Sequence, residues 1–337
     1  MPKTALITGT TGQDGSYLSE LLLDKGYKVF GLIRRSSTDT TERISSFINH
    51  PNFSLVEGDI TDSSCMHKII SGIKPDEVYN LAAMSHVGTS FDQPITTCNI
   101  DALGPLHILE AIRQTSPLTK YYQASTSELF GDTTVAPQSE TTPFNPNSPY
   151  AVAKLYAHHL VALYRRAYNI YACAGILFNH ESERRGEAFV TRKITKYVAG
   201  LQRWMDNNDG FPVKDADVLP LFLGNIDAKR DWSHAIDMVR GMWMMMQHST
   251  PDDYVLGSGK THSVRDFLSL AFGTIGLDYN DYVEIDQRFY RPADVNLLHS
   301  DPSKAKDILG WTPTIGFGEM VDIMVKSDYG TGDLCQD

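Results

Sequence analysis

Residues 4–15 read TALITGTTGQDG, an apolar run followed by a turn that carries three glycines. These glycines are Gly9, Gly12 and Gly15. Residues 4–8 predict a buried strand, and the amphipathic residues 16–25 predict the helix that follows the turn. Glycines at such a junction allow a tight turn and a close approach of a pyrophosphate to the backbone, and the helix N-terminus offers free N–H groups to the phosphates. The stretch predicts a nucleotide site, although a glycine turn without a ligand has the same pattern.

Short apolar runs continue to alternate with helical patterns as far as residue 178. Further strands are predicted at residues 28–33, 53–57, 77–82, 121–124 and 170–178, and further helices at residues 64–73, 103–115 and 151–168. Wholly apolar strands separated by helices indicate a parallel sheet covered on both faces. The predicted fold class is therefore α/β, a Rossmann-type doubly wound sheet with ligands beyond the carboxyl ends of its strands.

The regular alternation of apolar runs and helical patterns ends after Phe178, where a polar, charged loop begins. Later elements alternate irregularly with loops rich in Gly, Pro and Asp. We therefore expect a cofactor-binding Rossmann domain at residues 1–178. Residues 179–337 are expected to form mainly a smaller C-terminal substrate-binding lobe, with some segments returning to the first domain.

The amino-acid composition argues against several classes of protein. The net charge of −11 over 337 residues argues against binding to nucleic acid or to an anionic membrane, which needs a basic face. The four cysteines are widely spaced without metal-ligand clustering, which favours a reduced, cytoplasmic protein with no metal site. No apolar run reaches the roughly 18 residues of a membrane span, and Met1-Pro2-Lys3 leaves no room for a signal peptide before the first strand.

The end of the second strand indicates which dinucleotide is bound. It reads Arg34-Arg35-Ser36-Ser37 and begins 19 residues after Gly15. NAD enzymes usually carry an acidic residue about 20 residues on, for the ribose 2′-hydroxyl. Two guanidinium groups and two hydroxyls instead suit a 2′-phosphate, which a carboxylate would repel. NADP is the predicted cofactor; the alternative is a solvated basic loop.

The third and fourth strands end in residues that suit the same ligand. Gly58-Asp59-Ile60 ends the third strand, where a carboxylate can accept from the adenine amino group. Leu81-Ala82-Ala83 ends the fourth, where small side chains let a cofactor approach the backbone. Each is common at strand ends, so the prediction rests on their recurrence at the correct edge of the sheet.

Tyr150 and Lys154 open the helix after Pro149. A spacing of four places them on one helical face, one turn apart. Tyrosine acts as a base near neutral pH only if its pKa of about 10 falls, and a neighbouring ammonium together with a positive nicotinamide ring favours the phenolate. We therefore expect a lowered pKa for Tyr150. A surface Tyr–Lys pair is the alternative interpretation.

The fifth strand ends in Ser125-Thr126-Ser127-Glu128. Hydroxyls there can hydrogen-bond a substrate hydroxyl beside the tyrosine. Simple hydride transfer has no need of a second base, whereas β-elimination needs a group that takes a proton from one carbon and protonates the hydroxyl leaving its neighbour. Glu128 suits that role; a helix-capping or solvated glutamate is the alternative.

Together these motifs resemble the GDP-mannose 4,6-dehydratases, a branch of the extended short-chain dehydrogenase/reductases that modifies sugar nucleotides. The resemblance covers nearly the whole chain. It is carried by residues 9–15 with Gln13 and Asp14, 34–37, 125–131, 148–150 with Lys154, 179–182, 189–193, 228–232 and 291–294.

The resemblance implies a hydro-lyase that forms GDP-4-dehydro-6-deoxy-D-mannose and water. Tyr150 takes the C4 hydroxyl proton while hydride passes to NADP, Thr126 bonds the same oxygen, and Lys154 tunes the tyrosine and holds the ribose. Glu128 removes the C5 proton and protonates the hydroxyl that leaves C6, and the hydride then returns to C6. A second activity, 4-keto reduction with NADPH, stays open.

The resemblance also implies contacts that spacing alone does not give. Cofactor contacts are implied for Ser85, His180 and Arg185. Substrate contacts are implied for Ser85, Ser125, Thr126, Glu128, Asn179, Val190, Lys193, Phe222, Gly224, Arg230, Arg291 and Asp294. Read without the family, the basic residues among them are ordinary surface charges. Similar proteins form dimers or tetramers, with residues 34–37 reaching toward a neighbouring subunit's cofactor.

Three other functions fit the pattern less well. A 4-epimerase or 4-ketoreductase of the same fold keeps Tyr150 and Lys154 but has no evident use for Glu128. A dTDP-glucose-type dehydratase is expected to show an Asp-Glu pair and an acidic residue at the second strand, where this chain has Ser127-Glu128 and Arg34-Arg35. A non-enzymatic NADP-sensing protein is expected to lose the tyrosine, the lysine or the acid.

Overall fold

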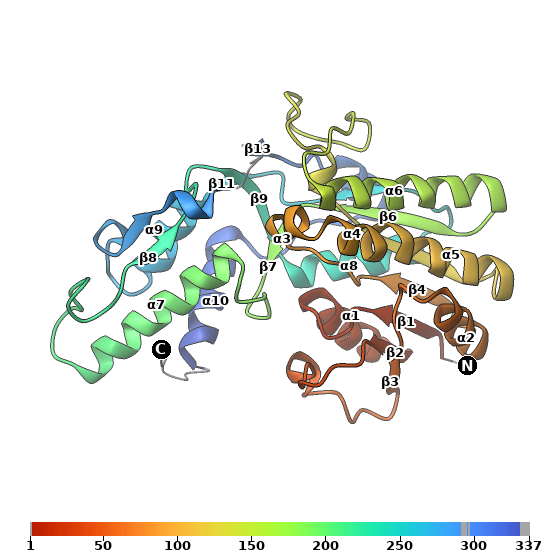
Figure 1. Ribbon diagram of the computed structural model, residues 1–337, viewed down its shortest axis with the longest axis horizontal. Helices are drawn as coiled ribbons and strands as arrows, with labels where there is room; N and C mark the ends of the chain where they lie inside the picture. Colours follow the sequence, from red (N-terminus) through yellow and green to blue (C-terminus); the bar gives the residue numbers. More distant parts are fainter. Residues whose placement is uncertain (1, 291–294, 296, 331–337) are drawn as a thin grey trace.

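A seven-stranded parallel sheet forms the centre of the larger part of the molecule (Figure 1). The computed structural model describes residues 2–290, 295 and 297–330. The strand order is β10 (Tyr254–Leu256), β6 (Ala172–Leu177), β5 (Lys120–Thr126), β4 (Glu77–Asn80), β1 (Thr4–Thr8), β2 (Lys28–Ile33) and β3 (Phe53–Glu57). Because β1 pairs with both β2 and β4, the chain winds outward from β1 in two directions. The predicted doubly wound sheet is confirmed.

Alternate residues of the strands supply two hydrophobic cores, one on each face of the sheet. Tyr121 belongs to the core under α2 (Ser63–Ile73), α5 (Gly104–Thr115) and α6 (Pro149–Tyr168). Its neighbour Tyr122 belongs to the core under α1 (Gln13–Asp24) and α8 (Ala235–Gln247) on the opposite face. Burial on both faces explains why these strands read as continuous apolar runs in the sequence.

Strand β10 and helix α8 both come from beyond residue 178. Strand β10 extends the sheet at its edge by pairing with β6, and α8 packs against α1, β5 and β6. We did not predict β10, because a three-residue strand leaves almost no periodic pattern to detect. Segments of the second half therefore complete the sheet of the first.

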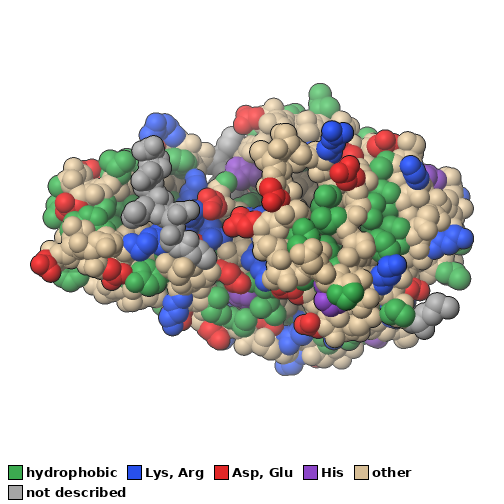
Figure 2. Space-filling view, turned by 90° about the horizontal axis from the view of Figure 1, so that it is seen from below, with side chains coloured by type: hydrophobic (Ala, Val, Ile, Leu, Met, Phe, Trp, Pro, Cys, Tyr) green, Lys and Arg blue, Asp and Glu red, His purple; other side chains and the backbone are tan. Residues whose placement is uncertain are grey.

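The remaining elements build a smaller lobe around a core of its own, on the left of Figure 1. Its helices are α7 (Val190–Asn207), α9 (Val264–Gly273) and α10 (Phe317–Gly330). Its small sheets are β11 (Thr261–Ser263), β9 (Lys229–His234) and β13 (Leu297–Leu298) with β7 (Asn179–Glu181) paired to β9, and β8 (Leu221–Leu223) with β12 (Val283–Ile285). Figure 2 shows basic and acidic side chains interspersed on the face that it displays.

Two short helices and a π-helical segment connect β4 to α5. They are α3 (Val87–Asp92), α4 (Pro94–Cys98) and η2 (Asn99–Leu103), and η2 packs against α6. Helix α6 begins where sequence chemistry favours it, because Pro149 fits the first helical position and the Ser148 hydroxyl accepts from the Ala151 N–H at 3.1 Å. Within the described ranges, no helix has the length and hydropathy needed to cross a membrane.

Candidate active site

The glycine turn after β1 is shaped for a ligand that lies close to the backbone. Gly9 has a φ of +71°, and a Cβ placed there would lie 2.9 Å from the Ala82 nitrogen. A Cβ on Gly15 would overlap the Gly9 carbonyl, so side chains are excluded at both positions. Gly12 caps α1 without any side-chain acceptor, which leaves the first N–H groups of the helix available to phosphates. The turn fits a pyrophosphate.

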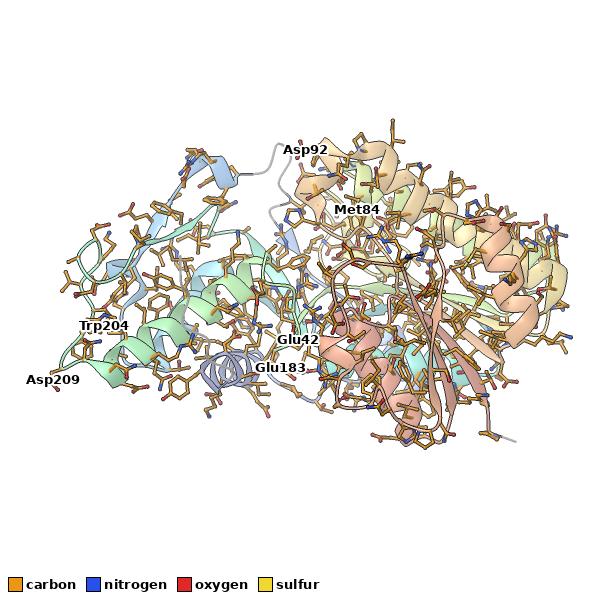
Figure 3. All side chains as sticks on the ribbon, turned by 60° about the horizontal axis from the view of Figure 1, so that its bottom comes forward. Glu42, Met84, Asp92, Glu183, Trp204 and Asp209 are labelled. Carbon is orange, nitrogen blue, oxygen red and sulfur yellow. The ribbon has the colours of Figure 1, made fainter. Side chains whose placement is uncertain are left out.

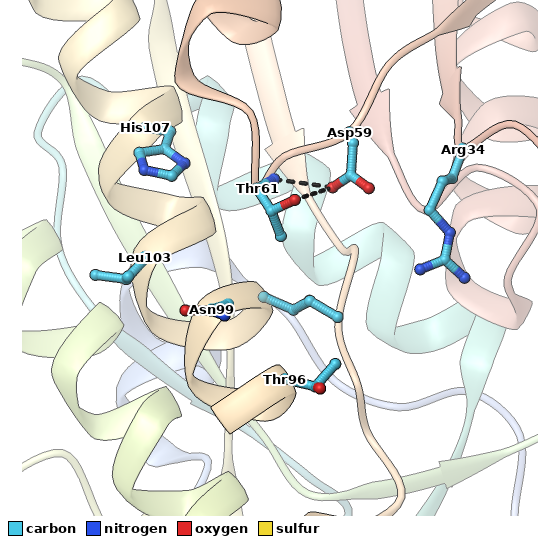
Figure 4. Close-up of a pocket in the computed structure, with 8 residues that line it drawn as sticks. Arg34, Asp59, Thr61, Thr96, Asn99, Leu103 and His107 are labelled. Carbon is cyan, nitrogen blue, oxygen red and sulfur yellow. Dashed lines mark hydrogen bonds between the residues drawn. The ribbon is translucent and has the colours of Figure 1, made fainter. Parts of the chain in front are cut away.

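A cavity of about 460 Å³ lies beside the ends of β2 and β3 (Figure 4). Its lining residues are Arg34, Asp59, Thr61, Thr96, Asn99, Ile100, Leu103 and His107. Asp59 Oδ1 accepts from the Thr61 backbone N–H at 2.9 Å and from its hydroxyl at 2.8 Å, while the Ile60 carbonyl lies 2.9 Å from His107 Nδ1. Of the lining residues, we had predicted only Arg34 and Asp59 as cofactor contacts. Thr61 lies on the turn just after Asp59, and the others lie on α4, η2 and α5, which only the tertiary structure brings here.

Arg34 and Arg35 also line a second hollow, with Glu57, Gly58 and Asp59. Both arginines are exposed, and neither forms a hydrogen bond or ion pair with a residue of the described ranges. Ser36 and Ser37 are likewise exposed, and the Ser36 hydroxyl lies 3.1 Å from that of Thr38. Two guanidinium groups without a protein partner are available to an anion.

The loop after β4 lies directly against the glycine turn. The Thr8 hydroxyl accepts from the backbone N–H groups of Leu81 at 3.1 Å and Ala82 at 3.0 Å. The backbone of Ala82 is also what a Cβ on Gly9 would strike, so this close approach requires glycine at position 9. Ala83 is half-buried and Ser85 is exposed on the same loop, just before α3.

The four predicted catalytic residues come together at the end of β5. Tyr150 is 7% exposed and Lys154 is 2% exposed, both on the first turns of α6. Lys154 Nζ donates to the Ala124 carbonyl at 3.1 Å and lies 5.8 Å from the centre of the Tyr150 ring. The Thr126 hydroxyl lowers the pKa of the Tyr150 phenol, and the charge of Glu128 raises it. The half-buried Glu128 side chain makes no ion pair with a described residue.

The electrostatics of Tyr150 differ from our expectation. Burial raises its pKa above the ordinary value of 10, and the carboxylates of Asp101 and Glu128 raise it further, against the Thr126 hydrogen bond and the charge of Arg185. Our prediction of a lowered pKa included the positive nicotinamide ring, and it did not count the cost of burying a phenolate, which acts in the opposite direction. Burial also lowers the pKa of Lys154, while Asp101 and Asp14 oppose that change.

Ser125 is not brought to this group of residues. Its hydroxyl lies 3.0 Å from Nδ1 of His158, within the protein. His158 lies on α6, two turns beyond Tyr150, so the Ser125 hydroxyl contacts the same helix at a different place. The predicted substrate contact of Ser125 therefore has a different partner in this structure.

The segment around β7 is tied to the cofactor turn. His180 Nε2 lies 2.8 Å from Asp14 Oδ2, and Gln13 Nε2 donates to the His180 carbonyl at 3.3 Å. The Ser182 hydroxyl donates to Gln13 Oε1 at 2.9 Å. The side chains of Gln13, Asp14 and His180, all predicted cofactor contacts, therefore hold two parts of the site together.

The loop that follows β7 carries charged residues with partners of their own. Arg185 pairs with Glu181 at 3.0 Å and stacks over the Phe189 ring at 3.6 Å. Arg43, which was not predicted because no motif includes it, donates to the Arg184 carbonyl at 2.8 Å. Figure 3 shows Glu42 and Glu183 close together at this junction of the two lobes.

Several predicted substrate residues gather in the smaller lobe. Val190 and Lys193 begin α7, and Lys193 Nζ lies 5.2 Å from the centre of the Phe289 ring. A Cβ on Gly224 would lie 2.6 Å from the Phe289 carbonyl. Phe289 is 47% exposed and was not predicted, because nothing but tertiary structure places it there.

The other predicted substrate residues lie on the strands of this lobe. Phe222 is exposed on β8, Asn179 is half-buried on β7 and Arg230 is buried on β9. Arg291 and Asp294 lie outside the described residues. Among the described residues, no group of His, Cys, Asp and Glu is arranged to hold a metal ion.

A doubly wound parallel sheet, a glycine turn at its centre and a Tyr–Lys pair at the end of β5 define an extended short-chain dehydrogenase/reductase. Solved structures agree with this fold. UDP-glucose 4-epimerase from Thermotoga maritima superimposes with a TM-score of 0.84 at 25% identity, covering 97% of this chain and 99% of that one. dTDP-glucose 4,6-dehydratase from Bacillus anthracis, solved in complex with NAD, gives a TM-score of 0.81 at 20% identity and covers 96% of both chains.

Within that class the chain belongs to the GDP-mannose 4,6-dehydratase family, whose model matches residues 6–324. GDP-mannose 4,6 dehydratase 2 of Arabidopsis thaliana is 51% identical over 336 residues, covering 97% of this chain and 87% of the relative. The GDP-mannose 4,6-dehydratase of Vibrio cholerae is 48% identical over 362 residues, covering 97% and 94%.

Proposed function

We propose that this chain is a hydro-lyase that converts GDP-D-mannose to GDP-4-dehydro-6-deoxy-D-mannose and water. The observation that carries the proposal is the free carboxylate of Glu128 beside the buried Tyr150–Lys154 pair. Family membership supports the GDP-sugar as substrate. A Tyr–Lys pair alone accounts for oxidation, whereas the added acid accounts for elimination.

Each of the four residues has a distinct task in this reaction. Tyr150 takes the proton of the C4 hydroxyl as hydride leaves C4, and Thr126 orients that oxygen. The 4-ketone acidifies the C5 proton, which Glu128 removes, and Glu128 then returns a proton to the hydroxyl that leaves C6 as water. A dinucleotide held at the glycine turn would supply the acceptor for the C4 hydride and the donor of the same hydride to C6. The proton that C5 then requires balances the one that Tyr150 took from the C4 hydroxyl. Lys154 keeps positive charge beside Tyr150 and is close enough to the site to hold the ribose.

We propose NADP rather than NAD as the dinucleotide. The fit is supported by the glycine turn, the uncapped start of α1 and the cavity that Asp59 and Arg34 line. Arg34 and Arg35, without protein partners among the described residues, suit a 2′-phosphate. A ribose 2′-hydroxyl would give them nothing to neutralise.

The GDP-sugar is proposed to lie between the two lobes. Lys193 and Arg230 are the basic groups of the described smaller lobe that suit its diphosphate. Val190, Phe222 and Gly224 would border it, with Asn179 at the junction. We accordingly keep the division into a cofactor domain at residues 1–178 and a mainly substrate-binding lobe at 179–337, with β10 and α8 returning to the first.

Incubation with GDP-mannose and NADP⁺ followed by mass spectrometry tests this function. The proposal expects a product lighter by about 18 Da, the mass of one water. A sugar of unchanged mass with altered stereochemistry would instead indicate epimerisation. No turnover of GDP-mannose by folded, cofactor-loaded protein would refute the proposal.

We further propose that the protein self-associates through α6. Val152, Tyr156 and Leu163 are 55%, 44% and 46% exposed, and they lie along one stripe of that helix. Exposed apolar surface of this kind marks protein interfaces. Leu163→Arg is expected to dissociate the oligomer in sedimentation velocity, and an unchanged oligomer would exclude this face.

Free Cys65, Cys98 and Cys173 support a reducing, cytoplasmic setting.

A further inference from the structure

Asp101 is a buried carboxylate to which the proposed mechanism gives no task. It lies on η2 and is 1% exposed. Its Oδ1 accepts from the Met84 backbone N–H at 2.9 Å. Its Oδ2 is buried and receives no hydrogen bond from any group of the described chain. Buried polar atoms are nearly always paired, because an unpaired one loses its hydration without compensation.

The bond to Met84 fixes the loop that follows β4. The Thr8 hydroxyl holds the beginning of this loop through the N–H groups of Leu81 and Ala82. Asp101 holds it two residues further on, at Met84 (Figure 3). The backbone against the glycine turn is therefore anchored from the sheet on one side and from η2 on the other.

The same carboxylate acts on both members of the Tyr–Lys pair. Among the charged groups that act on Lys154, Asp101 is the strongest and Asp14 the second. Among those that act on Tyr150, Asp101 is again the strongest, followed by Glu128 and, with opposite sign, Arg185. An ammonium that is 2% exposed and donates to the Ala124 carbonyl requires a counter-charge to remain protonated.

We propose that Asp101 is a positioning residue for the oxidation step: its Oδ1 anchors the loop at Met84, and its buried charge, on the segment η2 that packs against α6, stabilises the ammonium of Lys154. This inference rests on the proposed roles of Tyr150 and Lys154. It explains why a carboxylate with an unpaired oxygen is retained within the fold at this point.

The charge of Asp101 has a consequence that simple packing does not. A nearby negative charge favours the protonated forms of both Tyr150 and Lys154. Removing this charge lowers both pKa values. In a plot of activity against pH, one limb requires deprotonated Tyr150 and the other requires protonated Lys154, so both limbs move to lower pH. The whole bell-shaped pH profile shifts to lower pH, by about half to one unit. A loss of packing alone lowers the height of the profile and leaves its limbs in place.

Asp101→Asn separates the two cases, because the amide oxygen can still accept from Met84. The values of kcat and KM for GDP-mannose are measured with saturating NADP⁺ between roughly pH 6 and 10. We expect kcat to fall about tenfold at little change in KM, with both limbs displaced to lower pH. Asp92→Asn is the matched control, since Asp92 is an exposed carboxylate on the neighbouring α3, and it should keep the wild-type profile.

Three further variants make the outcome decisive. Asp101→Ser also removes the charge and is too small to overpack η2, so it carries the test if Asp101→Asn does not fold. If the limbs of the pH profile keep their wild-type positions in whichever variant folds, the proposal is overturned. Asp101→Glu restores the charge and should return the limbs to their wild-type positions. Tyr150→Phe is assayed in parallel. An active Tyr150→Phe would mean that the proposed site itself is wrong, whereas an inactive one with unmoved Asp101 limbs would reject only the role of Asp101.

Discussion

His180 and Asp14 form an ion pair between β7 and the first turn of α1, with Nε2 2.8 Å from Oδ2. The other ring nitrogen, Nδ1, lies 2.8 Å from the Phe178 carbonyl oxygen. A carboxylate and a carbonyl can only accept hydrogen bonds, so both ring nitrogens donate and the ring is an imidazolium. The pair joins the cofactor turn to the start of the segment that leads into the smaller lobe.

This pair predicts a pH-dependent stability. Burial alone would lower the pKa of His180, but the charge and hydrogen bond of Asp14 outweigh burial and hold the pKa above 6.5. A raised pKa contributes stability that is complete below the unfolded value of 6.5 and is lost as pH rises through the folded value. We expect the difference in Tm between wild type and His180→Asn to be larger near pH 6 than near pH 9. A difference in Tm that is the same at both pH values would contradict this prediction. His159 is exposed, so His159→Asn serves as the control and should show no such pH dependence.

Glu128→Gln tests the elimination step. Glutamine keeps the size of the side chain and its hydrogen-bonding oxygen but cannot carry the C5 proton to the C6 hydroxyl. Water loss should fall by about 10²- to 10⁴-fold, the usual worth of an acid–base group, with NADP and GDP-mannose binding largely intact. Mass spectrometry of the product and equilibrium binding measure the two quantities. Wild-type turnover by Glu128→Gln would refute the role of Glu128 in elimination. The control Glu319→Gln, at an exposed position on α10, should lose water from the substrate at the wild-type rate.

Tyr150→Phe tests the oxidation step. Without the phenol no group takes the C4 hydroxyl proton, so hydride transfer should stop and no reduced dinucleotide should appear in a single turnover. Absorbance near 340 nm or detection of the ketosugar measures this. Accumulation of a 4-keto intermediate in the variant would count against the assignment. Tyr156→Phe, on the same helix but 44% exposed, should oxidise substrate at the wild-type rate.

Arg34→Ala tests the choice of dinucleotide. A charge-assisted bond to a 2′-phosphate contributes roughly 1.5–3 kcal/mol, so the Kd for NADP should rise about 10- to 100-fold while that for NAD changes little. Fluorescence titration with the reduced cofactors measures both. An equal rise in the Kd values for NADP and NAD would show that Arg34 does not contact the 2′-phosphate. Arg166→Ala removes another exposed guanidinium and serves as the control.

Two glycines on helices predict opposite changes in stability. A Cβ at Gly15 would overlap the Gly9 carbonyl, so Gly15→Ala should destabilise the protein by about 1–3 kcal/mol and weaken dinucleotide binding. A Cβ at Gly200, within α7, meets no atom within 4 Å, so Gly200→Ala should stabilise by about 0.5–1 kcal/mol. Denaturant unfolding measures both, and a neutral Gly15→Ala would show that the turn has more room than its geometry gives it.

The sequence predicted the fold well where burial leaves a pattern. Strands β1, β2 and β3 have the predicted bounds, because each contains a short apolar run that ends at polar or charged residues. The segment η2 and strand β10 could not be predicted, since a π-helical segment has no distinct composition and a three-residue strand has no period. Their places are set by packing against α6 and β6.

The candidate site was predicted where residues follow one another at a strand end or share a helix face. That is true of Thr126, Glu128, Tyr150 and Lys154. Ser125 was predicted beside them, but its hydroxyl lies 3.0 Å from Nδ1 of His158, further along α6. Asp101 and Phe289 were missed because each reaches the site from an element whose position depends on tertiary structure alone.

The central claim is that one hydride leaves C4 and returns to C6 of the same sugar while Glu128 removes water between the two events. GDP-mannose carrying deuterium at C4 tests it most directly, with the product examined by mass spectrometry and NMR. The account predicts that the deuterium remains in the product and is found at C6, without any external reductant. Deuterium that is lost to the dinucleotide pool, or that remains at C4, would contradict it.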